Sequence, residues 1–133
     1  MENTNNQKIK IFVAAIIGAL IIVIGLGMTV NKPGSTKLDG FAQCITDSGA
    51  KFYGAFWCPH CQAQKALFGA SAKLLPYIEC SNADRSQKQA CIDAKVESYP
   101  TWEMKDGTRL PVENGAGVSL ETLAAKTQCV LPK

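Results

Sequence analysis

One segment of this 133-residue chain lacks charged side chains, and the region that follows it lacks net charge. Residues 11–31 contain no charged side chain, so this segment can enter hydrocarbon without burying an ion. Residues 38–133 do carry charges, but ten Lys and Arg are balanced by ten Asp and Glu. A neutral domain lacks the basic surface on which nucleic acid binds, so we expect no nucleic-acid partner. The formal net charge of +3 therefore comes from residues before position 38.

The uncharged segment is almost wholly apolar and long enough to cross a membrane. Twenty residues of α-helix extend about 30 Å, which is the hydrocarbon thickness of a bilayer. A secretory signal peptide is the alternative, but its apolar core has about 7–15 residues and ends in small residues, unlike residues 28–31. The sequence therefore predicts a tail over residues 1–10, one transmembrane anchor over 11–31 and a linker over 32–37.

The lysines beside the anchor do not settle its orientation, because two precede it and two follow it. Cysteine content is the second criterion, since all six cysteines lie beyond the anchor. Six cysteines in about 95 residues suggest an oxidising compartment. We therefore expect a single-pass protein of the cell membrane with a cytoplasmic N-terminus. Its C-terminal domain, residues 38–133, would be extracytoplasmic, either periplasmic or lumenal.

Two of the six cysteines stand three positions apart in the stretch FWCPHCQ, residues 56–62. A helix that begins at Cys58 has unpaired N–H groups and a partial positive charge at that end, and both stabilise a thiolate. Pro59 suits the first turn because the N–H it lacks would be unpaired there. His60 can add a proton donor or a positive charge beside the sulfur. Cysteines in such motifs have pKa values lowered to about 3.5–7.5.

The motif therefore predicts a redox-active dithiol, with Cys58 as the nucleophile and Cys61 as the resolving partner. An inert disulfide and half of a zinc site are the alternatives. A zinc site needs four convergent ligands, and Cys80 and Cys91 lack the tight spacing of a second half-site. We expect no metal and no cofactor.

The remaining pattern predicts one small α/β domain over residues 38–133. The expected elements are helix 38–48, strand 51–57, helix 58–75, strand 77–81, helix 86–95, strands 101–105 and 109–113, and a final helix capped by Ser119. Asp106-Gly107 is a hairpin signal between the last two strands, and Pro111 marks the second of them as an edge strand. A strand–helix–strand crossover followed by a hairpin gives a mixed central sheet with helices on both faces.

Three features together resemble the thioredoxin-like superfamily over nearly all of residues 38–133: the FWCPHC motif, Tyr99-Pro100-Thr101 about forty residues later, and the Asp106-Gly107 hairpin with glycines before the last helix. More narrowly, the stretches GAFWCPHCQAQKALFG, LPYIECS and SYPTWE, with Cys91, resemble the thioredoxin domain fused to the membrane core of bacterial vitamin K epoxide reductase homologues. A single anchor stands here in place of that multi-helix core. We therefore expect any such core to be a separate polypeptide.

The resemblance implies a three-layer thioredoxin-like fold and a role for each motif residue. Cys58 would be the exposed nucleophile and Cys61 its buried partner. Pro100 would be a cis-proline packed against the dithiol, and the backbone from Tyr99 to Thr101 would bind an incoming chain as an added strand. Trp57, which adjoins the nucleophile, would belong to the substrate-facing surface. The Cys-Pro-His-Cys motif also resembles that of strongly oxidising periplasmic enzymes.

One departure from the superfamily concerns the proton of the resolving thiol. Thioredoxins carry a buried carboxylate six positions before the nucleophile, and this chain has Phe52 there. The proton acceptor for Cys61 is therefore open, with Glu103, Lys105 and water as candidates.

The resemblance also implies a disulfide between Cys80 and Cys91, because the epoxide-reductase-type domains carry the same pair. Cys44 and Cys129 then remain. A bridge between them would close a loop of about 85 residues and stabilise the domain by roughly 4–5 kcal/mol in the chain-entropy model. The alternative is a buried apolar thiol at Cys44 and a free thiol at Cys129.

These expectations combine into a membrane-anchored protein thiol–disulfide oxidoreductase. It would donate the Cys58–Cys61 disulfide to reduced exported proteins and be reoxidised by a membrane-embedded, quinone-coupled partner of vitamin K epoxide reductase type. Reduction or isomerisation of extracytoplasmic disulfides is the reverse use of the same chemistry. A thioredoxin-like metallochaperone holding copper or zinc through Cys58, Cys61 and His60 is an alternative of another class. Scarce methionine, three residues in all, counts against copper.

Overall fold

The computed structural model describes residues 10, 13, 37–113 and 117–133. The predicted tail, anchor and linker therefore lie outside the described residues, apart from Lys10, Val13 and Lys37. In the described part of the chain, no helix has the length and apolar character needed to span a bilayer. Residues from 37 onward belong to one compact unit, Ser35–Lys133, and the following description concerns that unit.

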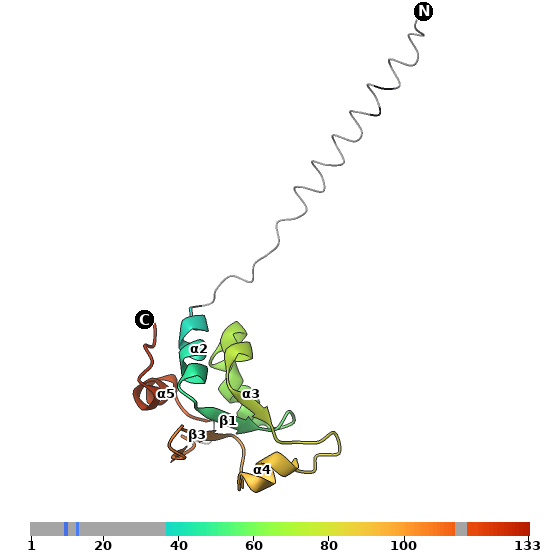
Figure 1. Ribbon diagram of the computed structural model, residues 1–133, viewed down its shortest axis with the longest axis vertical. Coiled ribbons are helices and arrows are strands. Elements are labelled where there is room, and N and C mark those ends of the chain that lie inside the picture. Colours follow the sequence, from blue (N-terminus) through green and yellow to red (C-terminus); the bar gives the residue numbers. More distant parts are fainter. Residues whose placement is uncertain (1–9, 11–12, 14–36, 114–116) are drawn as a thin grey trace, which may run out of the picture. The chain divides into compact units, whose positions relative to one another are not determined.

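The order of helices and strands in this unit is the predicted one (Figure 1). In chain order the elements are α2 (Asp39–Asp47), β1 (Lys51–Gly54), α3 (Pro59–Ala66), the 3-10 helix η1 (Gly69–Leu74), β2 (Tyr77–Glu79), α4 (Gln89–Asp93), β3 (Thr101–Glu103), β4 (Arg109–Leu110) and α5 (Leu120–Thr127). One predicted helix, over 58–75, is wrong because it is two elements. Gly69 has φ +54 between them, a left-handed conformation that glycine adopts without steric cost and that ends the α-helix.

The sheet is mixed, as predicted, with the strand order β2-β1-β3-β4. β1 and β2 are parallel and connected through α3 and η1, whereas β1–β3 and β3–β4 are antiparallel pairs. Gly107 supplies a positive φ of +83 in the β3–β4 hairpin. β4 is an edge strand that ends at Leu110, one residue before Pro111, because proline has no N–H to donate to the ladder.

The two faces of the sheet carry cores of unequal size. Phe52 and Tyr53 are neighbours on β1 and point to opposite faces. Phe52 and Trp102 belong to the large cluster, which also contains residues of α2, α3 and α5. Tyr53 belongs to a small cluster with Cys80, Cys91 and Val96. Figure 1 shows α2 and α3 on one side of the sheet and α4 on the other. This arrangement fits a thioredoxin-like fold.

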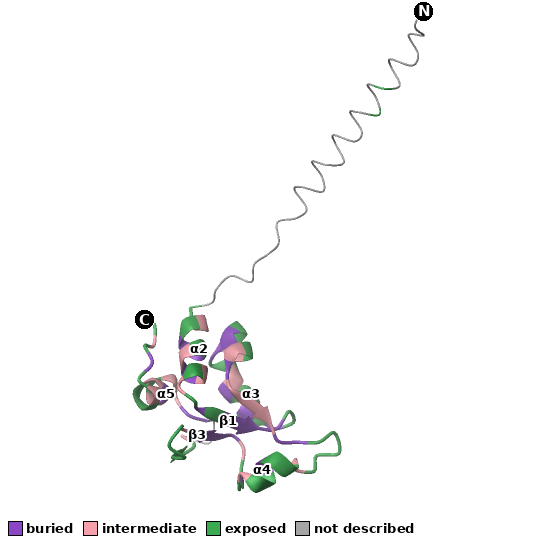
Figure 2. Ribbon diagram, in the orientation of Figure 1, coloured by how far each residue is buried: buried purple, intermediate pink, exposed green. Residues whose placement is uncertain are grey.

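Four cysteines form two disulfides. Cys44 in α2 is bonded to Cys129, which follows α5, and 85 positions separate the two residues. Cys80, directly after β2, is bonded to Cys91 in α4, with a sequence separation of 11. The first bond joins two elements of the large core. The second fastens α4 to the thinner face, where Cys91 is the one buried residue of that helix. Figure 2 shows the rest of α4 mostly in the colour of exposed residues.

Candidate active site

The two cysteines of the CPHC motif are the unbonded pair, and they lie where β1 leads into α3. Cys58 is the N-cap residue of α3, with extended φ and ψ of −79° and 118°, and Pro59 stands in the first turn. Cys58 accepts a hydrogen bond from the Gln62 N–H at its carbonyl and donates its own N–H to the Ala55 carbonyl at 3.0 Å. The helix therefore begins one residue later than predicted. The Cys58 sulfur still lies at the positive end of the helix.

Cys58 is covered more than the resemblance implied. Only 5% of its surface is exposed, against 1% for Cys61, so the expectation of a plainly exposed nucleophile is wrong for this reduced pair. The reason is the segment before β3: the Cys58 thiol donates a hydrogen bond to the Tyr99 carbonyl, with 3.7 Å between sulfur and oxygen. Only a small opening to the Cys58 sulfur remains. The order of exposure, with Cys58 more accessible than Cys61, is the order that the nucleophilic assignment needs.

The Cys61 thiol is protonated at neutral pH. The pKa of Cys61 is raised to about 12, chiefly by burial and in smaller part by the side chain of Cys58, while a backbone hydrogen bond from Ala55 and the charge of Lys65 oppose the change. Thiolates rather than thiols attack disulfides. Cys61 must therefore lose a proton before it can resolve a mixed disulfide.

The Tyr99–Pro100 segment lies against the dithiol. The peptide bond between these residues is cis, and Pro100 is among the fully buried side chains. Thr101 follows as the first residue of β3 and is 8% exposed. Its hydroxyl donates to the Ser98 carbonyl at 2.7 Å, which fixes the bend before the strand. Among the residues expected to bind substrate, Tyr99 offers its carbonyl directly at the sulfur of Cys58.

Two aromatic residues, Phe56 and Trp57, directly precede Cys58 in the chain. Phe56 is 50% exposed and Trp57 is 39% exposed in the turn between β1 and α3. The Trp57 ring meets the Tyr99 ring edge-on, with 6.3 Å between the ring centroids. The Trp57 indole N–H donates to the Ser81 hydroxyl at 2.8 Å, which holds the ring in place. Phe56 and Trp57 therefore expose apolar surface directly before Cys58, and the contact of Trp57 with substrate stays a prediction.

His60 and Pro59 are both exposed in the first turn of α3. Within residues 37–113 and 117–133, no three His, Cys, Asp or Glu side chains gather closely enough to hold a metal ion.

The charged candidates for the proton acceptor lie away from Cys61. Glu103 pairs with Lys51 at 3.2 Å and with Arg109 at 3.1 Å, and Lys51 is at the opposite end of β1 from the dithiol. Lys105 is exposed in the hairpin and lies beside Gly49. Phe52 is fully buried and stacks on Trp102, with ring centroids 4.7 Å apart. Aromatic packing therefore fills the position of the thioredoxin carboxylate.

Glu79, a carboxylate at the end of β2, was not expected from the sequence to belong to the site. One of its partners is Phe56 of the motif, and the other two, Tyr77 and Ser81, lie on either side of Glu79 in the chain. Glu79 Oε1 accepts the N–H of Phe56 at 3.2 Å and the N–H of Ser81 at 2.9 Å. Its Oε2 accepts the Tyr77 hydroxyl at 2.8 Å. An acidic residue within the short strand YIE, next to a cysteine, was the available signal.

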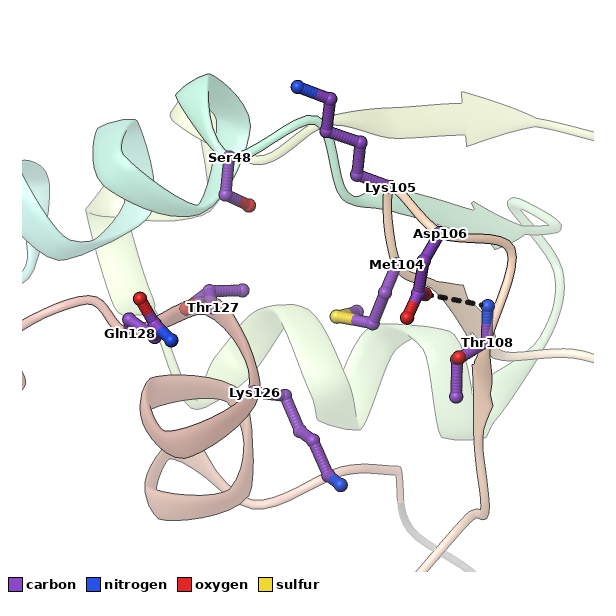
Figure 3. Close-up of a pocket in the computed structure, with 8 residues that line it drawn as sticks. All are labelled: Ser48, Met104, Lys105, Asp106, Thr108, Lys126, Thr127 and Gln128. Atoms are coloured by element: carbon purple, nitrogen blue, oxygen red, sulfur yellow. Dashed lines mark hydrogen bonds between the residues drawn. The ribbon is translucent and has the colours of Figure 1, made fainter.

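A separate pocket of about 340 Å³ lies at the β3–β4 turn (Figure 3). Its lining comes from that turn and from the ends of α2 and α5: Ser48, Met104, Lys105, Asp106, Thr108, Lys126, Thr127 and Gln128. None of these residues belongs to the CPHC motif or to the segment around Pro100. The pocket is therefore distinct from the dithiol site.

Comparison with known proteins adds one informative similarity. The chain matches no protein-family model. It is 46% identical over 82 residues to the thiol-disulfide oxidoreductase LTO1 of Arabidopsis thaliana. The match covers 58% of this chain but only 22% of the relative, so this chain corresponds to a small part of that protein.

Proposed function

We propose that the chain is a membrane-anchored protein thiol–disulfide oxidoreductase that donates the Cys58–Cys61 disulfide to reduced exported proteins. One observation carries the proposal. Four cysteines are bonded to each other, while Cys58 and Cys61 remain free at the start of α3, with the Tyr99 carbonyl against the Cys58 sulfur. The similarity to the thiol-disulfide oxidoreductase of Arabidopsis thaliana supports the same chemistry.

The proposed reaction starts from the Cys58–Cys61 disulfide. A substrate thiolate attacks the Cys58 sulfur, and a mixed disulfide forms while Cys61 leaves with the electron pair and takes up a proton. A second substrate thiolate then attacks the substrate sulfur of the mixed disulfide. The substrate gains its disulfide, and Cys58 leaves as a thiolate at the N-terminus of α3, where the helix dipole stabilises negative charge. The substrate loses two electrons and the dithiol gains them.

Reoxidation follows the same steps in reverse with a different partner. Cys58 attacks a disulfide of the partner, and Cys61 then displaces the partner's sulfur from Cys58. We propose a membrane-embedded, quinone-coupled partner of vitamin K epoxide reductase type. The uncharged segment 11–31 supports a location beside such a partner, since the stretch over residues 31–37 reaches at most about 25 Å. The six cysteines beyond this segment, four of them in disulfides, support an extracytoplasmic domain.

An extended substrate segment is proposed to lie along Tyr99, Pro100 and Thr101. The apolar rings of Phe56 and Trp57 beside this segment would contact substrate side chains, as their exposure supports. Unfolded chains expose both apolar side chains and backbone, so this surface suits reduced, unfolded proteins better than small thiols.

The test is disulfide formation in a reduced, unfolded protein by the oxidised full chain. We expect Cys58→Ala to abolish the reaction and Cys61→Ala to accumulate mixed disulfides on Cys58, both visible by non-reducing electrophoresis. Val130→Ala, at an exposed position after α5, is a matched control that should leave the rate unchanged. Full activity in Cys58→Ala would refute the proposal.

The redox potential of the pair decides the direction of the reaction. A value near about −120 mV favours a donor of disulfides, whereas a value near about −270 mV favours a reductase of extracytoplasmic disulfides. Stoichiometric copper or zinc in the purified chain, without any exchange activity, would instead support the metallochaperone.

A further inference from the structure

Cys61 needs a proton acceptor, and the position that holds a carboxylate in thioredoxins is occupied by Phe52. Across the sheet, Phe52 is paired in register with Tyr77 of β2, and the two rings meet edge-on at 5.2 Å. Two positions further along β2 lies Glu79. We infer that Glu79 is the group that exchanges the proton of Cys61, with Tyr77 and solvent linking its carboxylate to the sulfur. This inference rests on the function proposed above and assigns a positioning and proton-handling role within it.

The first argument is the close approach of Tyr77 to Cys61 over Gly54. A Cβ atom added at Gly54 would lie 2.8 Å from Tyr77 Cε2 and 2.9 Å from Cys61 Sγ. The two atoms are therefore no farther apart than these two distances together. Any side chain at position 54 would fill the space between the phenol ring and the sulfur. Glycine leaves that space free.

The second argument is the way in which the Glu79 carboxylate is held. One oxygen accepts two backbone N–H groups, from Phe56 and Ser81, and the other accepts the Tyr77 hydroxyl. Hydrogen bonds to a carboxylate are stronger than those between neutral groups, so three of them fix its orientation. The Phe56 N–H lies in the turn that leads to Cys58. The carboxylate is therefore fastened to the same turn that carries the dithiol.

The third argument is electrostatic and concerns Tyr77 and Lys65. Burial, the hydrogen bond to Glu79 and the nearby charges of Glu79, Cys61 and Cys58 all raise the pKa of Tyr77 well above its usual value. Tyr77 thus keeps its proton and responds to both Glu79 and the dithiol. Lys65 Nζ lies 3.2 Å from the centroid of the Tyr77 ring, and its charge lowers the pKa of Cys61.

Solvent can reach the Tyr77 side chain from the side of Lys65. A pocket of about 420 Å³ is lined by Lys65, Ala72, Lys73, Leu75 and Tyr77. Glu79 is itself only partly buried. When Cys58 is held in a mixed disulfide, the Cys61 proton passes through solvent to Glu79 and the Cys61 thiolate displaces the sulfur bonded to Cys58. When Cys61 is instead the leaving group, the proton returns from Glu79 to its sulfur.

The test uses the full chain with the Cys58–Cys61 pair reduced and both structural disulfides intact. An aromatic disulfide, 5,5′-dithiobis(2-nitrobenzoate), reacts in two phases. Cys58 attacks first and releases one coloured nitrothiobenzoate anion, and Cys61 then displaces the second anion from Cys58. Stopped-flow absorbance between pH 6 and 9 follows both phases, so the second phase reports the attack by Cys61.

We expect Glu79→Gln, which keeps the shape of the side chain and one acceptor oxygen for the Phe56 and Ser81 N–H groups, to slow the second phase at pH 7 by about tenfold or more. Its rate should then rise about tenfold per pH unit, because only thiolate formed by loss of the proton to solvent reacts. Tyr77→Phe, which keeps the ring, should shift the profile in the same direction by less. Glu103→Gln removes a carboxylate on β3 and should leave the second phase unchanged.

The inference is overturned if Glu79→Gln and Tyr77→Phe both keep the unaltered rate and slope, or if Glu103→Gln produces the change expected of Glu79→Gln. Should Glu79→Gln fail to fold, as judged by circular dichroism, Tyr77→Phe decides alone. The assay requires no protein substrate. A chain that shows the expected two-phase profiles but cannot oxidise proteins would contradict the proposed function and leave the role of Glu79 intact.

Discussion

The six cysteines divide into bonded and unbonded pairs, and the elements that each pair joins explain the division. Cys44–Cys129 connects α2 to the segment after α5, and Cys80–Cys91 connects β2 to α4. The unbonded pair lies within one helical turn, at the start of α3. A bond between separate elements restricts the unfolded chain and stabilises the fold. A bond within one turn can open and close without moving an element, so it is suited to chemistry.

The largest effect should come from the longer bridge. Replacing both of its cysteines, as Cys44→Ala with Cys129→Ala, is expected to lower the free energy of unfolding by about 4–5 kcal/mol, because the bridge closes the larger loop. Urea unfolding of the oxidised chain measures this loss. Cys58→Ala, which leaves both bridges, should unfold close to the unaltered chain. If the double variant loses no more free energy of unfolding than this control, the bridge between separate elements does not stabilise the fold as expected.

The shorter bridge should contribute less. Cys80→Ala with Cys91→Ala is expected to lower the free energy of unfolding by about 3 kcal/mol, since its loop is shorter. The small core around Tyr53 and Val96 adds little packing against α4 to compensate. The same urea experiment gives the value. A loss above that of the longer bridge would show that attachment of α4, rather than loop length, decides what a bridge contributes.

The unbonded pair should have a smaller effect on the free energy of unfolding, and this effect should depend on pH. The pKa of Cys61 is raised from 9.0 to about 12 by burial, so folding favours the protonated thiol. Stability from this group is complete below pH 9 and is lost as the pH rises towards 12. Between pH 8 and 10, the free energy of unfolding of Cys58→Ala should fall by about 1 kcal/mol more than that of the double variant, in which Cys61→Ala is added. Equal losses would mean that Cys61 is not the buried thiol described here.

Sequence patterns were sufficient for the order of elements because each has a local signal. Ser119 is an N-cap, and its hydroxyl accepts the Thr122 N–H at 3.2 Å as that signal predicts. The ends of elements were harder to predict. Gly69 divides the helix expected over 58–75, because a positive φ at one glycine depends on what packs around it. Strands of two to four residues are likewise limited by the length of their partners.

In the candidate site, too, features with a local sequence signal could be predicted, whereas contacts between distant segments could not. The CPHC motif is contiguous, so the position of Cys58 at a helix start could be predicted from the sequence. Glu79 could not, because its partner Phe56 lies 23 positions away and the contact exists only once β1 and β2 pair in parallel. Glu103 was chosen from sequence for its charge, but the register of β3 places it opposite Lys51. The pairing of distant strands therefore decides which carboxylate is bonded to the turn that carries the dithiol.

The two tryptophans have consequences for spectroscopy. Trp102 is fully buried, its ring is stacked on Phe52, and its indole N–H has no hydrogen-bond partner among the residues that the structure describes. Trp57 is partly exposed and directly precedes Cys58. Their fluorescence therefore arises from two very different surroundings, and a dissolved quencher such as iodide has access to one indole and not to the other. The chain carries an intrinsic optical reporter beside its dithiol and an internal reference within its core.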